Sequence, residues 1–325
     1  MSRPRAVDDV DSKAAGQFAA DVEYYLSLDP RQLPSRYLYD ALGSALFEAI
    51  CRLPWYRITR AEASMLVRHA RDILRPLRRP VTLAELGGGS GEKIALLIGA
   101  AAEPFPLIQL IDISAAALEM ARYRLQAIGV RDVMTHHLAY EQGLMRAIER
   151  RPQDASLVVL FLGSNIGNFT PEAAHDSLTR IRRSLRPGDA LLLGTDLVKP
   201  ERELLLAYDD PLRVTAAFNR NLLRRINDEL GGNFDLDGFR HRATWNAAAK
   251  RVEVFLVSAR RQQVAIPDAD IEFELEAGEP IWTESSHKYE PDQVMAEGLA
   301  AGFSGGEQWI ERGARFALTR FDLDD

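Results

Sequence analysis

The sequence predicts an α/β fold: a doubly wound, mostly parallel sheet with an antiparallel last strand, joined to a second α+β domain. Three observations support this prediction. From about residue 60, short apolar runs alternate with amphipathic helices, which is the pattern of βαβ units. A glycine-rich turn, GGGSG, links the first apolar run to a helix. The chain closes with two short runs separated by Arg312 and Gly313, which predict an antiparallel hairpin.

Each element of the predicted core follows from its local pattern. A helix is expected at 60–77, because Leu66, Ala70 and Ile73 recur on one helical face. Consecutive apolar residues predict buried strands. The predicted strands are 81–86, 107–112, 133–137, 156–163, 189–196, 307–311 and 315–321. After the helix at 60–77, further helices are predicted at 92–102, at 114–129, in a polar stretch before 156, at 171–185 and at 291–302. Between 198 and 286 a helical stretch is followed by strand-like HRATWNAAAKRVEVFLVSA, which we interpret as an insertion.

Composition excludes several classes of protein. The 325 residues carry 40 Lys and Arg against 47 Asp and Glu, a net charge of −7, and the arginine doublets are scattered, so nucleic acid is not expected as a partner. The single cysteine, Cys51, excludes an internal disulfide and a cysteine-based zinc site. His136 and His137 are adjacent and would point to opposite faces of a strand, so we expect no metal.

The sequence also bears on location and assembly. No apolar run approaches the roughly 18 residues of a membrane helix, and the start MSRPRAVDDV lacks the apolar stretch of a secretory signal. We therefore expect a cytoplasmic protein that does not bind membranes, with a monomer as the default.

The loop ELGGGSGEK follows a predicted strand and opens a helix, a context in which backbone N–H groups bind a ligand. A dinucleotide motif, G-x-G-x-x-G, would need glycine at Glu92 or at Ile94, so a dehydrogenase is disfavoured. Two carboxylates instead suit S-adenosylmethionine: Glu85 before the loop and Asp112 at the end of the next strand. Asp112 can accept hydrogen bonds from both ribose hydroxyls of this cofactor.

The stretch VVLFLGSNIGNFTP, residues 158–171, begins as a buried strand and ends in two asparagines among glycines. Asn168 lies just beyond a central strand, where open α/β sheets bind ligands. The competing interpretation is that Asn168 caps the helix that begins near Pro171.

Together with GSNIGNF, several longer strings resemble the histidine Nα-methyltransferases of ergothioneine biosynthesis. These strings are YDALGSALFEAICRLPWY, ELGGGSGEK, LLGTDLVK, AYDD, VTAAFNRN and TESSHKY. The resemblance covers nearly the whole chain. It implies a class I (Rossmann-like) methyltransferase core, residues 60–197 and 287–325, and a substrate-binding domain, residues 10–59 and 198–286. It also implies up to three methyl transfers from S-adenosylmethionine to the α-amine of L-histidine, giving hercynine.

The resemblance assigns roles by position. It implies that Asn168 and Tyr208 hold the amino-acid head group and that Gly163 and Asn165 line the same end. The imidazole would be held by Tyr56, Glu284 and Ser286, and Tyr39 would lie beside the methylated nitrogen, so Asn168 and Tyr39 are the expected catalytic residues. The cofactor site would comprise Gly87, Gly89, Lys93, Asp112 and Tyr140.

Some positions depart from the family pattern. The family usually has a small hydroxyl residue at Asn165 and methionine at Val254. Where many relatives hold adenine with Gly-Asp and an aromatic residue, this chain has Leu138, Ala139 and Tyr140. Two rival hypotheses follow from these departures: the same chemistry on another amino acid, such as an aromatic one, and a noncatalytic S-adenosylmethionine-binding protein.

Overall fold

The structure is a computed structural model that describes residues 8–101 and 103–324. The residues outside these ranges include the first seven, used above to judge secretion, and Ala102, the last residue of the predicted helix 92–102. The chain divides into two compact units. The core unit comprises Cys51–Pro200, Ala247–Arg251 and the described part of Ser286–Asp325; the second unit comprises the described part of Met1–Ile50, Glu201–Asn246 and Val252–Ser285.

The core unit is built on a seven-stranded sheet in the order β11-β12-β5-β4-β1-β2-β3. Its strands are β1 Val81–Leu86, β2 Ile108–Asp112, β3 Val133–His137, β4 Ser156–Phe161, β5 Ala190–Asp196, β11 Gly305–Glu311 and β12 Phe316–Asp322. The first five run parallel, whereas β12 pairs antiparallel with both β5 and β11. The predicted doubly wound sheet with an antiparallel last strand is confirmed.

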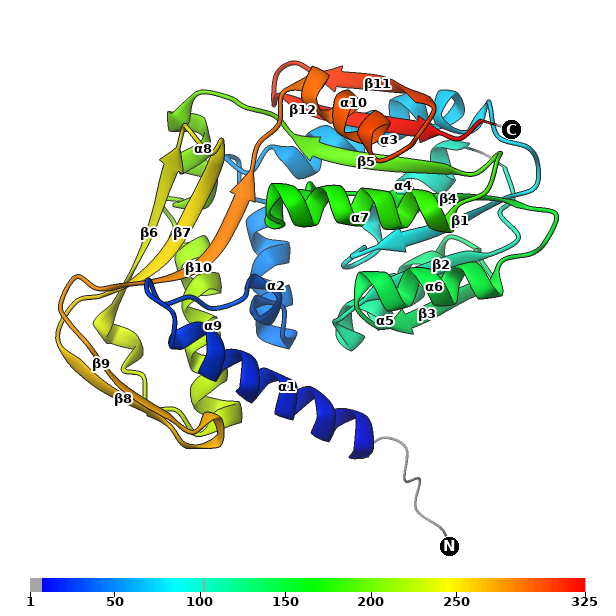
Figure 1. Ribbon diagram of the computed structural model, residues 1–325. Coiled ribbons are helices and arrows are strands. Elements are labelled where there is room, and N and C mark those ends of the chain that lie inside the picture. The colour runs from blue at the N-terminus through cyan, green and yellow to red at the C-terminus, as the bar shows by residue number, and fades with distance from the viewer. Residues whose placement is uncertain (1–7, 102, 325) are drawn as a thin grey trace, which may run out of the picture. The chain divides into compact units, whose positions relative to one another are not determined.

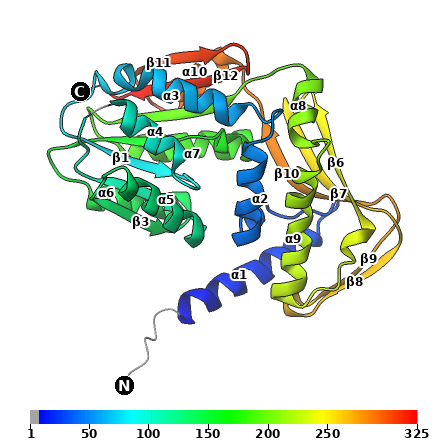
Figure 2. The same cartoon turned by 180° about the vertical axis from the view of Figure 1, so that it is seen from behind.

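Helices cover both faces of this sheet (Figures 1 and 2). One layer contains α3 Ile58–Leu74, α4 Glu92–Ala101 and α5 Ala115–Ala127, and the other contains α6 Tyr140–Arg150, α7 Pro171–Ser184 and α10 Pro291–Ala300. Ala84 and Leu86 of β1 belong to the apolar cluster under α6 and α7. Because successive strand residues point to opposite faces, Glu85 between them faces the α3 and α4 layer.

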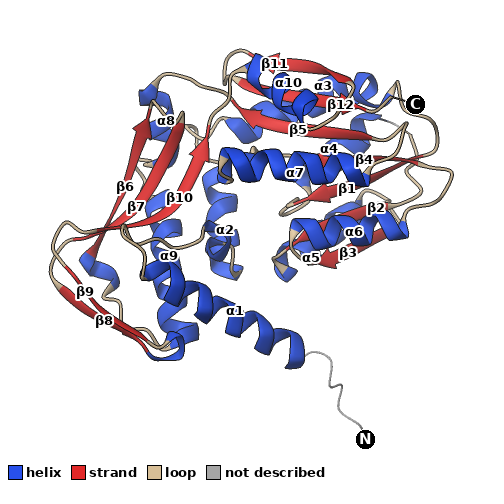
Figure 3. Ribbon diagram, in the orientation of Figure 1, coloured by secondary structure: helices blue, strands red, loops and turns tan. Residues whose placement is uncertain are grey.

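The second unit combines helices with short sheets, coloured by type in Figure 3. Its helices are α1 Asp8–Leu26, α2 Ala41–Cys51, α8 Glu201–Tyr208 and α9 Val214–Leu230, and its strands are β6 Phe239–Asn246, β7 Arg251–Ser258, β8 Gln262–Ile266, β9 Ile271–Leu275 and β10 Pro280–His287. The end residues Cys51 of α2, Arg251 of β7, and Ser286 and His287 of β10 belong to the core unit. The strands form a sheet of order β10-β7-β6 and a separate β8-β9 pair. Short 3₁₀ helices complete the chain: η1 Ser35–Leu38, η2 Asn165–Asn168, η3 Leu236–Gly238 and η4 Pro267–Ala269.

The unit boundaries differ from the predicted domain ranges at several places: residues 51–59, 198–200, 247–251 and 286 were predicted in the second domain but belong to the core unit. Residues 51–59, predicted in the second domain, pack with the core unit, where α3 begins at Ile58. None of the helices in the described ranges is both long and apolar enough to cross a membrane.

Candidate active site

The glycine loop after β1 has a backbone that only glycine adopts readily. Gly87, Gly89 and Gly91 have φ of 68°, 54° and 71°, in the left-handed region. A Cβ built on Gly91 would lie 2.7 Å from the Cβ of Ala121, so the loop packs directly against α5. Helix α4 begins at the next residue, Glu92, and the loop therefore meets the N-terminus of a helix as predicted.

Asp112, at the end of β2, is tied to this loop. Its Oδ2 accepts the backbone N–H of Gly89 at 3.1 Å, and its Oδ1 accepts that of Ser114 at 2.9 Å. Burial raises the pKa of Asp112, while these backbone bonds oppose the shift. Each carboxylate oxygen has two lone pairs, so Asp112 can still accept hydrogen bonds from two hydroxyl groups.

Glu85 provides a test of whether a cationic cofactor fits the loop. Both of its carboxylate oxygens are buried and have no hydrogen-bond partner within the described residues. The carboxylate lies against Gly88, whose Cβ would come within 2.4 Å of Oε2. Burial raises the pKa of Glu85 to about 7, with Lys93 opposing the shift and Glu62 and Asp112 adding to it. An unsatisfied buried carboxylate is costly, and the ammonium and sulfonium charges of S-adenosylmethionine would offset that cost.

Two predicted residues meet over Gly87. A Cβ on Gly87 would lie 2.6 Å from Oη of Tyr140 and 2.9 Å from Nδ2 of Asn165. Asn165 donates from Nδ2 to the carbonyl oxygen of Gly87 at 3.3 Å. Burial raises the pKa of Tyr140, and Asp112 adds to the shift, so this phenol stays neutral. Tyr140 and Asn165 thus lie together at the glycine loop.

The loop between β4 and α7 is held at several points, but Asn168 is not one of them. The Oγ of Ser164 accepts the N–H of Asp196 at 2.9 Å, and the carbonyl of Gly167 lies 3.1 Å from Nδ1 of His287. The cap of α7 is Thr170, whose hydroxyl accepts the N–H of Ala173 at 3.2 Å. The capping interpretation of Asn168 is therefore wrong. Its side chain is partly exposed and makes no hydrogen bond to any described residue.

A buried ionic cluster joins the family strings GTDLVK and SSHKY. Asp196, at the end of β5, pairs through Oδ2 with Lys288 at 3.0 Å and through Oδ1 with Lys199 at 2.5 Å. Lys288 is fully buried and also donates to Oγ of Ser286 at 2.9 Å. The predicted substrate residue Ser286 is thereby fixed by a lysine that sequence reasoning did not identify. Lys288 lies outside every predicted helix and strand, so its sequence context gave no sign of its burial.

The remaining core-unit residues are Lys93, Gly163 and Tyr56. Lys93 extends from the first turn of α4 to Glu62 of α3, with Nζ 2.8 Å from Oε2. Gly163 follows β4 with φ of 78°, and its N–H is donated to the same Glu62 carboxylate. Tyr56, between α2 and α3, is buried. Sequence reasoning also missed Glu62, although a carboxylate four residues before Leu66 on an apolar helical face was a usable signal.

Three predicted residues belong to the second unit. Tyr208 is buried in an apolar cluster with Leu204, Val252 and Val254. Tyr39 makes edge-to-face contacts, with ring centroids 5.5 Å from those of both Phe47 and Phe218. The structure thus places Val254, the position where the family has methionine, beside the predicted head-group residue Tyr208. Glu284 lies on β10, and its backbone carbonyl accepts the indole N–H of Trp282 at 2.9 Å.

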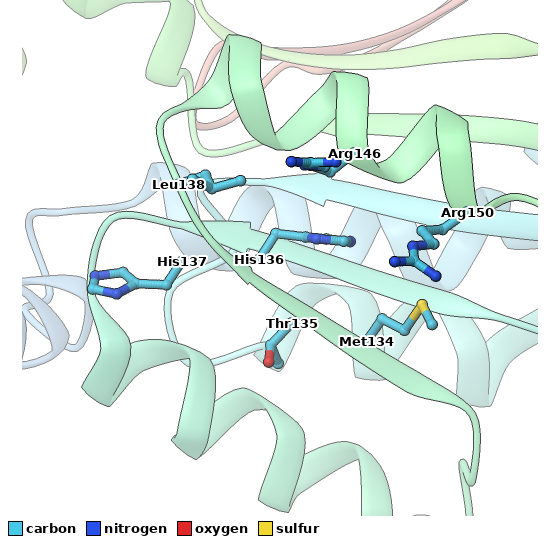
Figure 4. Close-up of a pocket in the computed structure, with 7 residues that line it drawn as sticks. All are labelled: Met134, Thr135, His136, His137, Leu138, Arg146 and Arg150. Carbon is cyan, nitrogen blue, oxygen red and sulfur yellow. The ribbon is translucent and has the colours of Figure 1, made fainter. Parts of the chain in front are cut away.

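A separate pocket lies beside the edge strand β3 (Figure 4). His136 extends toward Arg150, and both Arg150 and Arg146 come from α6. Burial lowers the pKa of His136, and the two arginines lower it further. The lining comprises Met134, Thr135, His136, His137, Leu138, Arg146 and Arg150, which includes none of the predicted site residues. Within residues 8–101 and 103–324, no three His, Cys, Asp or Glu side chains are grouped to hold a metal ion.

Comparisons with known proteins agree with this geometry. The sequence profile of a family described as "Histidine-specific methyltransferase, SAM-dependent" matches residues 18–323. The "Histidine N-alpha-methyltransferase" of Mycolicibacterium smegmatis is 39% identical over 314 residues, which are 94% of this chain and 95% of that protein. The protein of the same name from Mycobacterium tuberculosis is 38% identical, with the same coverage. The "Ergothioneine biosynthesis protein 1" of Neurospora crassa is 30% identical over 64% of this chain and 24% of its own length.

The sheet order, the antiparallel β12 and the glycine loop backed by Asp112 define a class I methyltransferase that uses S-adenosylmethionine. The match over residues 18–323 is more specific. The chain belongs to the family of histidine-specific, S-adenosylmethionine-dependent methyltransferases.

Proposed function

We propose that this protein transfers methyl groups from S-adenosylmethionine to the α-amine of L-histidine, up to three times, giving hercynine. Family membership supports the reaction, and one structural observation supports the acceptor site. Asn168 presents an amide without a hydrogen-bond partner in the described structure, at the carboxyl end of β4, on a loop whose neighbouring residues are held in place. Such an amide is available to hydrogen-bond a ligand, and the held neighbouring residues fix its position before the ligand binds.

The residues around the glycine loop of the core unit suit S-adenosylmethionine. S-adenosylmethionine supplies an electrophilic methyl group on a sulfonium, which a neutral amine can attack in line. Asp112 would accept the ribose hydroxyls, and Glu85 would pair with the cofactor's ammonium. Lys93 would pair with its carboxylate, while Tyr140 would lie along the glycine loop.

The acceptor amine needs to be unprotonated, and the chain can meet this need without a strong base. The amide oxygen of Asn168 would accept a hydrogen bond from the amine and direct its lone pair. A nearby sulfonium disfavours the ammonium form. After the last transfer the nitrogen has no proton, and we propose that the ring of Tyr39 then stabilises the cation. The roles of Tyr208, Glu284, Ser286 and Tyr56 toward histidine remain predictions from the resemblance.

Mass spectrometry tests the proposal. The protein is incubated with S-adenosylmethionine and L-histidine, and mono-, di- and trimethylated histidine are expected in sequence. Absence of methylated histidine, with S-adenosylhomocysteine binding intact, would overturn histidine as the acceptor. Turnover with any acceptor would exclude a noncatalytic binding protein.

A second candidate is the same chemistry on another amino acid, for example an aromatic one. Val254 favours it, because this residue is fully buried beside Tyr208 and is smaller than the methionine of the family. Parallel assays with histidine, phenylalanine and tryptophan separate the two candidates.

A further inference from the structure

Glu62 is a carboxylate on the apolar face of a helix. It shares this face of α3 with Leu66 and Ala70, spaced at four-residue intervals, and the whole residue has an exposed fraction of 0%. A buried carboxylate is retained only where it has partners that compensate for its lost hydration. The partners of Glu62 come from two different functional segments.

The first partner is the backbone of Gly163, at the start of the GSNIGN loop. Its N–H lies 2.8 Å from Oε1 and 2.9 Å from Oε2 of Glu62. The second partner is Lys93 of α4, with Nζ 2.8 Å from Oε2. The sheet makes room for the carboxylate at Gly194 of β5, where a Cβ would lie 2.0 Å from Oε1.

These contacts place the Lys93 ammonium beside the GSNIGN loop. A Cβ on Gly163 would lie only 2.8 Å from Nζ of Lys93. Burial lowers the pKa of Lys93, but Glu62 raises it by charge and by hydrogen bonding, and Glu85 and Cys51 raise it further, so the net shift is upward. Glu62 is the largest of the influences that keep this lysine charged.

We propose that Glu62 is a positioning residue for the methyl transfer: it holds the Lys93 ammonium at the cofactor site and anchors Gly163, and thus the loop that carries Asn168, with one carboxylate. The proposal rests on the role of Lys93 in the proposed function. It implies that Glu62 acts on the cofactor through Lys93, without touching it. The single buried side chain of Glu62 then sets the distance between helix α4, which carries Lys93, and the GSNIGN loop, which carries Asn168.

The test is calorimetric binding of S-adenosylhomocysteine to E62Q and to wild type, at pH 7 and pH 9.5. The glutamine retains an acceptor for Gly163 but not the charge opposite Lys93. Affinity should fall about tenfold or more at pH 7, as expected for a lost charge-assisted hydrogen bond. The loss relative to wild type should grow at pH 9.5, because Lys93 without Glu62 has a lower pKa and releases its proton earlier.

Matched variants isolate the effect. E149Q removes an exposed carboxylate of α6, which lies 3.0 Å from Arg146 and outside the cofactor site, and should change affinity little at either pH. In a K93Q background, E62Q should add almost no further loss of affinity, because the interaction is already absent. Thermal unfolding at both pH values checks that each variant is folded.

Three results would overturn the proposal: unchanged affinity in E62Q, a loss of affinity that does not change with pH, or full additivity with K93Q. Replacing a residue that only supports the fold would lower the melting temperature, but the loss of affinity would not depend on pH. If E62Q does not fold, E62D keeps the charge but withdraws the oxygens by one methylene; wild-type affinity in E62D would then reject the proposal. Failure of wild type to bind S-adenosylhomocysteine would instead reject the proposed function.

Discussion

Asn165 donates its side-chain amide to the carbonyl oxygen of Gly87, at 3.3 Å, and so joins the loop after β4 to the glycine loop after β1. The two strands are parallel neighbours, and their carboxyl ends meet at the same edge of the sheet. The helices that follow them lie on opposite faces, since α4 and α7 belong to different layers. Ligands of open α/β sheets bind where the chain diverges in this way. The predicted cofactor loop and acceptor loop are therefore in direct contact.

Replacement of Asp112 by alanine should weaken cofactor binding. The carboxylate accepts Gly89 and Ser114 N–H groups and is proposed to accept the ribose hydroxyls, and each such bond contributes about 1.5 to 3 kcal/mol. Calorimetry with S-adenosylhomocysteine should show at least a tenfold loss, on the order of one such bond. Asp154→Ala, at an exposed position, is the control. Unchanged affinity in a folded Asp112→Ala protein would disprove the assignment.

Glu85→Gln should stabilise the cofactor-free protein at alkaline pH. The folded pKa of Glu85, about 7, exceeds its ordinary value of 4.5, so the folded state binds the proton more tightly than the unfolded state. Its contribution to the free energy of unfolding therefore falls as pH rises from about 4.5 through 7, by roughly 3 kcal/mol at most.

The measurement is the melting temperature of wild type and Glu85→Gln at pH 5.5 and pH 8.5. The melting temperature of Glu85→Gln relative to that of wild type should be higher at pH 8.5 than at pH 5.5. The affinity of the variant for S-adenosylhomocysteine should be lower than that of wild type. Glu141→Gln, at an exposed residue paired with Arg180, should show no such pH dependence. A constant difference in melting temperature would mean that Glu85 is ionised in both states.

Cofactor binding near neutral pH should release a proton. Glu85 is partly protonated there, and an ammonium beside it lowers its pKa. Calorimetry in two buffers with different ionisation enthalpies measures the proton directly. Equal binding enthalpies in the two buffers would show that Glu85 does not change its charge.

The rate of methyl transfer should rise from neutral to mildly alkaline pH. The substrate ammonium must lose its proton before attack, and Asn168 accepts a hydrogen bond but removes no proton. Initial rates at saturating cofactor, with methyl transfer limiting, test this expectation. A flat profile would reveal a general base that the proposed mechanism lacks.

Glu284→Ala should shift specificity away from histidine. A carboxylate that accepts the imidazole N–H favours histidine and is left unpaired by an apolar ring. The change should lower kcat/KM for histidine by about one to two orders of magnitude, the equivalent of a lost contact of roughly 1.5 to 3 kcal/mol. It should raise kcat/KM for phenylalanine or tryptophan, assisted by the space at Val254. An equal loss on every acceptor, with cofactor binding intact, would show that Glu284 does not recognise the side chain.

The sequence by itself determined the alternating core and the glycine loop that is predicted to bind the cofactor. Periodicity and runs such as VTLAEL and SLVVLF report burial directly, so the strands of the sheet and the hairpin around Gly313 were predictable. The positive φ of Gly87 and Gly89 could be expected because few other residues adopt it in a turn between a strand and a helix.

Tertiary structure alone decided which distant polar groups meet. Glu62 and Lys93 lie on different helices, and Asp196 and Lys288 are separated by more than ninety positions of the sequence. The apolar helical face that carries Glu62 indicates its burial, but no local pattern identifies Lys93 as its partner or marks the pair of Asp196 and Lys288, because the partners meet only when the layers pack. The same holds for Thr170, which caps α7 and leaves the amide of Asn168 without a hydrogen-bond partner in the described structure. Hydrogen-bond geometry, which depends on the folded backbone, decided between two residues that were both suitable caps by type.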